Sequence, residues 1–134
     1  MGHWGVKSFE NDDAADALDG AFERVHRDRY DALMDDGNPM SVDKIQEALA
    51  NPETLAAALA LLGESVARPF DEWDEVERLA YAGVVVRHAE FGIPIPEEVR
   101  LRALDWLEHE EIEWDEATVR RLRRDKEIVR LRGL

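Results

Sequence analysis

The chain has 134 residues, of which 45% are hydrophobic and 36% are charged, as is typical of a single globular domain with its own core. It contains no cysteine, which excludes disulfides, thiolate metal sites, iron–sulfur clusters and a thiol nucleophile. The formal net charge of −14 argues against nucleic-acid binding over most of the surface, because phosphates require Lys and Arg. We therefore predict a folded domain with no nucleic-acid partner.

The start of the chain and its apolar runs predict a cytoplasmic location. The first residues contain no charged segment followed by an apolar stretch, so no signal peptide is visible. The longest strongly apolar run, around Leu55 to Leu62, is far too short to cross a bilayer. Gly2 suggests myristoylation, but Val6 stands where that motif needs Ser or Thr. We expect a cytoplasmic protein with no membrane partner.

The N-terminal part of the chain predicts an arm followed by a helix. Residues 1–10, which are punctuated by glycine and aromatic residues, are expected to form an ordered arm. Cap-type residues at 11–13 then precede apolar residues that recur at three- and four-residue spacing as far as Leu33, the mark of one buried helical face. Residues 36–39, Asp-Gly-Asn-Pro, end this helix because glycine and proline both interrupt helical backbone.

Three further helices are expected in the middle of the chain. The first runs over about 41–50, and the next begins at the Asn-Pro pair at 51–52, a cap followed by a first-turn proline. The third, over about 72–90 with Asp71 as its cap, is apolar on more than one face and is the candidate for the central helix. Its valines at 84–86 also suit a strand, but no neighbouring alternation supplies a partner strand.

Two helices are expected in the C-terminal part. Pro96 suits the first position of a helix, and the two glutamates that follow it are favoured in a first turn. A last helix over 115–132 carries a thin apolar stripe of Val119, Leu122 and Val129 among many arginines. Because this stripe is thin, the last helix is expected to be only partly packed.

Together these elements predict an all-α fold, a compact array of five or six helices that forms one domain over 1–134, with the arm at 1–10.

The charge is unevenly distributed along the chain. Residues 120–132 include seven basic and two acidic side chains, a local charge of +5. Since the net charge of the whole chain is −14, the remaining residues together carry −19. A body this acidic attracts basic partners. The alternative is that the acidity only keeps the protein soluble or reflects its environment.

The opening residues carry a distinctive motif. Two glycines, Trp4 and Phe9 precede the run Asn-Asp-Asp-Ala-Ala-Asp at 11–16, at fixed spacings. This pattern resembles the signature of the bacterial family catalogued as domain of unknown function 4259, and the resemblance is confined mainly to residues 1–20. It implies a small, mostly helical bacterial protein, and it assigns no activity and no catalytic residue.

The motif has a structural and a functional interpretation. In the structural one, the glycines let the aromatic side chains fold back onto the first helix, Asn11 or Asp12 caps that helix, and Asp13 and Asp16 lie in its first turn. In the functional one, the same polar groups, with His3, form a site at the helix start. The candidate motif residues are Trp4, Phe9, Asn11, Asp12, Asp13 and Asp16.

The four histidines do not complete a metal-site pattern. Glu23-x-x-His26 matches half of the di-iron bundle signature, which needs a second such pair. His109 is not followed by a second histidine at the spacing of a zinc-protease helix. The acidic run over 105–116 lacks the alternating ligands and central glycine of an EF-hand loop. We therefore predict no metal ligand and no cofactor.

Catalytic motifs do not occur either. No serine lies in a Gly-x-Ser-x-Gly elbow, and the chain has neither a Walker loop nor Gly-x-Gly-x-x-Gly. With 31 acidic residues, no carboxylate pair stands out for acid–base chemistry. No catalytic residue is predicted, and an enzymatic activity is unsupported.

Three hypotheses for the function follow from these features. The first is a protein–protein interaction module, of the immunity or antitoxin kind, that uses its acidic surface against a basic protein partner. The second is a small enzyme or metal-binding protein with a polar site at the start of the first helix. The third is a structural subunit of a homo-oligomer joined by charge-complementary patches.

Overall fold

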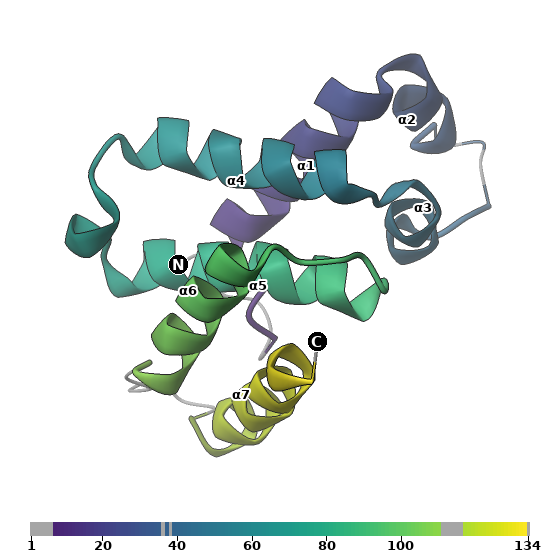
Figure 1. Cartoon of the computed structure of the whole chain (residues 1–134). Helices are drawn as coiled ribbons and strands as arrows, with labels where there is room; N and C mark the ends of the chain where they lie inside the picture. The colour runs from purple at the N-terminus through teal and green to yellow at the C-terminus, as the bar shows by residue number, and fades with distance from the viewer. Residues whose placement is uncertain (1–6, 36, 38, 111–116, 134) are drawn as a thin grey trace.

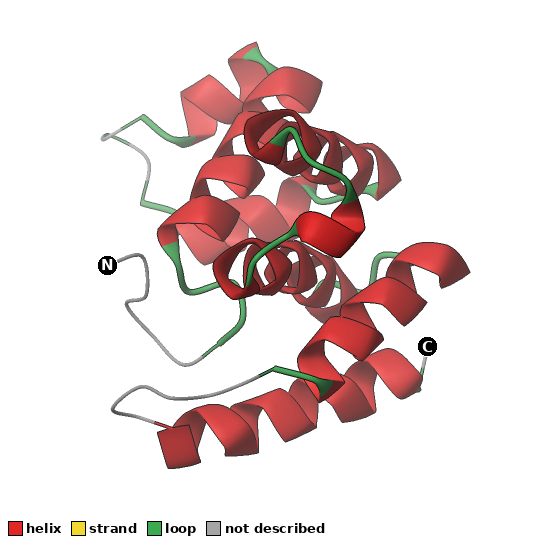
Figure 2. Cartoon of the chain, turned by 90° about the vertical axis from the view of Figure 1, so that its left-hand side faces the viewer, coloured by secondary structure: helices red, strands yellow, loops and turns green. Residues whose placement is uncertain are grey.

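A computed structural model of the chain describes residues 7–35, 37, 39–110 and 117–133. Within them the regular elements are helices (Figures 1 and 2). These are α1 (Asp12–His26), α2 (Asp28–Leu33), α3 (Val42–Leu49), α4 (Pro52–Val66), the 3₁₀ turn η1 (Phe70–Glu72), α5 (Glu75–Glu90), α6 (Glu97–Glu108) and α7 (Ala117–Arg132). The all-α, single-domain prediction is confirmed. None of the described helices has the length and apolar character needed to cross a bilayer.

The seven α-helices of the described chain outnumber the five or six expected, partly because the first predicted helix is two helices. α1 ends at His26, and Arg27 then adopts a φ of +49°, which interrupts the helix. Tyr30 of α2 is nevertheless buried and stacks on Phe22 of α1, with ring centroids 5.8 Å apart. The apolar spacing therefore continues across the break, so it could not show where α1 ends.

Side-chain caps set the starts of several helices. Asn11 accepts a hydrogen bond from the third residue of α1, as the motif suggested, and Asn51 forms a reciprocal capping box at α4. The prediction that Asp71 caps the central helix was wrong. Asp71 lies in η1, and the cap of α5 is Asp74, whose side chain accepts from the Glu77 backbone N–H at 2.8 Å.

α5 is the central helix, as predicted. It contacts α1, α4, α6 and α7, and all residues from 79 to 89 are buried. The valines at 84–86 are helical and fully buried. Figure 1 shows α5 crossing the middle of the molecule, with α1 and α4 above it and α7 below. A helix enclosed on all sides has no solvent face, and for this reason its sequence shows no single apolar stripe.

An aromatic cluster joins η1 to α5 and α6. The rings of Phe70, Trp73, Tyr81 and Trp106 lie with their centroids 5.1–6.0 Å apart. Arg102 covers the cluster, with its guanidinium 4.0 Å from the Phe70 ring centre, and donates a hydrogen bond to the Tyr81 hydroxyl at 3.1 Å. These tryptophans therefore hold the α4–α5 connection onto the domain.

α7 buries the opposite face from the one its sequence suggested. The stripe of Val119, Leu122 and Val129 is 52%, 62% and 69% exposed. Charged side chains are buried instead, and they can lie in an interior only when they are paired. The start of the last predicted helix, residues 115–116, lies outside the described residues. The buried face of α7 consists of Arg120, Glu127, Ile128 and Leu131.

Candidate functional site

The buried part of the N-terminal motif serves the fold. Phe9 and Asn11 are 8% and 1% exposed, and Trp4 lies outside the described residues. The Asn11 side chain donates to the Ser8 carbonyl at 2.7 Å and accepts from the Ala14 backbone N–H at 2.9 Å. Both its nitrogen and its oxygen are thus used to hold the N-terminal arm against the start of α1.

The arm lies so close to α5 that one helical position has no room for a side chain. A Cβ atom added at Gly83 would lie 2.3 Å from the carbonyl oxygen of Ser8 and 2.8 Å from the Cα of Phe9. One turn further along α5, the Arg87 guanidinium lies 4.7 Å from the centre of the Phe9 ring. An isolated glycine inside a helical pattern was the only signal of this close approach in the sequence.

A buried ion-pair network connects the arm to α7. One carboxylate oxygen of Glu127 accepts from the Ser8 backbone N–H at 3.0 Å and from the Ser8 hydroxyl at 2.9 Å, and the other accepts from Arg120 at 2.9 Å. Arg120 also donates to both oxygens of Glu110, at 2.7 and 3.1 Å. Burial by itself lowers the pKa of Arg120, but the hydrogen bonds and charges of Glu110 and Glu127 outweigh it and raise that pKa. Arg120 therefore keeps its charge in this buried position.

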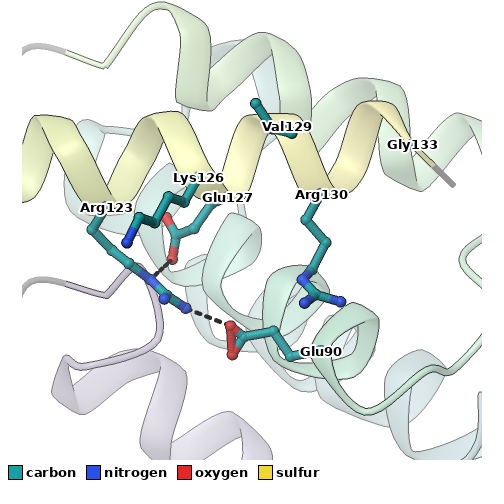
Figure 3. A pocket seen from close by; sticks show the side chains of 7 residues that line it. All are labelled: Glu90, Arg123, Lys126, Glu127, Val129, Arg130 and Gly133. Atoms are coloured by element: carbon teal, nitrogen blue, oxygen red, sulfur yellow. Dashed lines mark hydrogen bonds and ion pairs between the residues drawn. The ribbon is translucent and has the colours of Figure 1, made fainter.

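A pocket of about 480 Å³ lies beside this network along α7 (Figure 3). Arg123 lies between Glu90 of α5 and Glu127, and it pairs with both. Lys126 and Arg130 point to the same side of α7 as Glu90. Because Arg123 is committed to two carboxylates, the pocket offers a ligand only the two exposed cations beside it.

His88 is a buried connection between α4 and α5. Its Nδ1 lies 2.9 Å from the Val84 carbonyl oxygen, and its Nε2 lies 2.8 Å from the Thr54 hydroxyl, which also lies 2.8 Å from the Asn51 carbonyl. Burial is the largest effect and lowers the pKa of His88; the Val84 carbonyl opposes it, and the charge of Arg87 adds to it. The lowered pKa favours the neutral ring, which connects α4 to α5.

The exposed aspartates of the motif lie at a groove between α1, α4 and α5, called the acidic groove below. Its volume is about 290 Å³, and its charged lining residues are Asp13 and Asp16 of α1 and Glu77 of α5. The sequence placed the two aspartates at a helix start, but only the fold adds Glu77 to them. The rest of the lining is mostly apolar and consists of Ala17, Gly20, Leu61, Leu62, Ser65, Val66 and Ala80.

The neighbouring carboxylates oppose the ionisation of Asp13. Partial burial is the largest cause that raises the pKa of Asp13, and the charges of Asp16, Asp12, Asp74 and Glu77 raise it further, in that order. Neither Asp13 nor Asp16 forms an ion pair with a basic side chain of the described segments. A cation bound in the groove would relieve this repulsion.

The acidic surface continues along the outer face of α1. Asp12, Asp16, Asp19 and Glu23 are all exposed and recur at four-, three- and four-residue spacing, which places them on one side of the helix. At a rise of about 1.5 Å per residue, they extend over roughly 16 Å. Asp31 of α2 joins them, and its hydrogen bond is the largest cause that raises the pKa of Glu23.

A second groove, of about 400 Å³, lies between α4 and the start of α6. None of its lining residues is charged, so it offers apolar area but no polar group to orient a ligand. Its lining consists of Pro52, Leu55, Ala56, Leu59, Pro94, Ile95, Pro96 and Val99.

Within the described residues, no three or more His, Asp or Glu side chains are arranged to hold a metal ion. No protein-family model, curated protein or solved structure matches the chain. The resemblance of the N-terminal motif to the family of unknown function 4259 therefore stays a prediction. The acidic groove, which contains two residues of that motif, is the candidate site.

Proposed function

We propose that this protein is a protein–protein interaction module that binds a basic segment of a partner in the acidic groove. The observation that carries the proposal is that Asp13 and Asp16, which have no cationic partner in the described chain, line a groove together with mostly apolar residues. Lys and Arg side chains combine an aliphatic stem with a cationic head, and the groove offers a surface to each part. Inhibition of a basic target, as by an immunity protein or an antitoxin, is a function that this groove suits.

The charge distribution supports the same proposal in two ways. A net charge of −14 steers a basic partner toward the protein, with an association rate that falls as salt screens the field. In addition, the raised pKa of Asp13 returns toward its ordinary value when a cation binds beside it. Binding should therefore weaken as the pH falls through the raised pKa, because Asp13 then takes up a proton instead of a cation.

The hypothesis of a polar catalytic or metal site centred on Asn11 gains no support from the geometry. The Asn11 amide is buried and already bonded to Ser8 and Ala14. The aspartates that follow it face the acidic groove or lie exposed on α1. In the interaction hypothesis, these exposed carboxylates bind the basic side chains of the partner.

Fluorescence anisotropy with a labelled synthetic helix of leucine, lysine and alanine tests the proposal. The variant Asp13→Asn/Asp16→Asn should bind this peptide about tenfold more weakly at low salt, the equivalent of about 1.4 kcal/mol. The control variant, Glu47→Gln/Glu53→Gln, loses the same charge at exposed positions outside the acidic groove and should bind nearly as the native chain does. Equal losses in the two variants would mean that only net charge matters and that the groove is not the site.

A further inference from the structure

α7 carries an exposed apolar face, called the outer face below. Val119, Leu122 and Val129 are each more than half exposed and recur at three- and seven-residue spacing, so they lie along one side of the helix. In Figure 3, Val129 points to the opposite side of α7 from Glu90. A surface helix normally turns such residues toward the core. In α7 the inward positions are taken by the ion-pair network, and the apolar residues face outward.

Basic side chains lie within and beside this apolar stripe. Around the helix, Lys126 lies between Leu122 and Val119 and Arg130 lies beyond Val119, and both side chains turn toward Glu90 (Figure 3). On the other side, Arg121 is separated from Val129 by the exposed Asp125. All three basic side chains are exposed, and no ion pair joins them to another residue of the described ranges. From Arg121 to Arg130 the cations extend over roughly 14 Å of helix. The outer face therefore combines three apolar side chains with three basic ones and one acidic one, Asp125, and its net charge is positive.

The acidic groove has the complementary character. Its lining is mostly apolar and includes Asp13, Asp16 and Glu77, of which Glu77 already pairs with Arg68. The acidic face of α1 beside it is of nearly the same length as the basic segment of α7. α7 does not cover the groove of its own chain. In the described structure it contacts α5 and α6 but neither α1 nor α4, and Figure 1 shows it at the other end of the molecule.

We propose that the outer face of α7 docks in the acidic groove of a second copy of this chain. The inference rests on the proposed function, because it names the occupant of that same groove. Leu122 and Val129 pack on the apolar lining residues, and Lys126 approaches Asp13 and Asp16. Since the two surfaces differ, the contact is heterologous, and copies join head to tail instead of closing as a symmetric pair.

Charge complementarity favours this occupant over others. Pairing α7 with α7 of a second copy would place two basic faces together, and like charges in an interface oppose binding. An anionic lipid surface would attract α7 but repel the rest of the chain, which carries −19 outside residues 120–132. One helix in one groove is a small interface, of the class below about 1,200 Å², so the association is weak and reversible.

Sedimentation velocity of the full chain at low salt tests the proposal, with two double variants. Leu122→Gln/Val129→Gln removes the apolar stripe at exposed positions, and Asp13→Asn/Asp16→Asn removes the groove charges. The native chain should show an average mass that rises with concentration past that of a dimer, and salt at 0.5 M should weaken the association at least about tenfold. Each variant alone should be monomeric at the same concentrations.

The mixture of the two variants gives the sharpest result. One variant keeps an intact groove and the other an intact α7, so the mixture should form complexes of two chains and nothing larger. The control Glu47→Gln/Glu53→Gln should associate as the native chain does, and circular dichroism should show that every variant keeps its helices.

Three results would overturn the inference. One is a native chain that stays monomeric at millimolar concentration. Another is a dimer lost in the α7 variant but kept in the groove variant, which would indicate α7–α7 pairing. The third is association only in the presence of anionic vesicles. If the leucine–lysine peptide binds the groove while the chain stays monomeric, the proposed function stands and this inference alone fails; if neither occurs, both fail.

Discussion

Replacing Glu127 by Gln tests whether buried charge holds α7 and the N-terminal arm together. The Glu127 side chain is 1% exposed, and three donors converge on it at 2.9–3.0 Å, two from Ser8 and one from Arg120. Glutamine keeps the size of the side chain but removes its charge and replaces one acceptor oxygen with an NH₂ donor. In either orientation of the amide, its NH₂ group then faces another donor, the Ser8 backbone N–H or the Arg120 guanidinium.

Glu127→Gln should lower the free energy of unfolding by a large amount. Removing one partner of a buried ion pair costs about 3–5 kcal/mol, and the lower end applies here because Arg120 keeps both hydrogen bonds to Glu110. Total stabilities of single domains are about 5–15 kcal/mol, so the change removes a substantial share of the stability. The matched control is Glu108→Gln, whose pair with Arg132 is exposed, with side-chain exposures of 37% and 62%. It should cost less than about 1 kcal/mol.

Urea unfolding followed by circular dichroism measures both variants at neutral pH. Glu127→Gln should lower the transition midpoint, while the m-value, which reports the surface exposed on unfolding, should stay as in the native chain. A reduced m-value would mean that α7 is already detached in the folded variant. If Glu127→Gln costs no more than Glu108→Gln, the claim that buried charge anchors α7 is wrong.

Three further predictions concern the arm and the core. Gly83→Ala should destabilise the protein in urea unfolding, because the added Cβ would lie 2.3 Å from a carbonyl oxygen of the arm. Gly63→Ala, whose added Cβ has no atom within 4 Å, should instead stabilise α4 by about 0.5–1 kcal/mol. Because folding lowers the pKa of His88, the free energy of unfolding should decrease as the pH falls from about 6.5 toward the lowered pKa, by at most about 1.4 kcal/mol per pH unit. The variant His88→Gln should lack this pH-dependent part of the stability. Asn11→Ala should cost about 1–2 kcal/mol in thermal unfolding, and more than Ser41→Ala, which removes an exposed cap.

Each of these predictions has a contradicting outcome. Native stability in Gly83→Ala would mean that the arm does not lie against α5 as described. Identical pH dependence in the native chain and His88→Gln would show that the ring does not titrate with a lowered pKa. Equal costs for Asn11→Ala and Ser41→Ala would show that the buried hydrogen bond to the arm contributes nothing beyond the cap.

The fold class and most of the helix boundaries could be predicted from local sequence patterns. These depend on interactions between residues that are close in the chain, such as the caps at Asn11 and Asn51 and the proline that follows Asn51. The burial of α5 was also predictable, since a helix that is apolar on several faces is stable only when it is enclosed. Local patterns were less informative at Arg27, where the backbone breaks without a glycine or proline.

The buried face of α7 and the position of the acidic groove depend on contacts between distant parts of the chain, which local patterns do not contain. Arg120 can be buried because Glu110 and Glu127 pair with it, and the energy of a charge depends on its partners rather than on its helical position. A periodicity rule that counts only apolar residues therefore chose the wrong face of α7. The groove likewise needs Asp13 and Glu77, which lie far apart in the chain and meet only when α1 and α5 pack together. Local propensities act over a few residues, whereas these contacts exist only after the helices have packed.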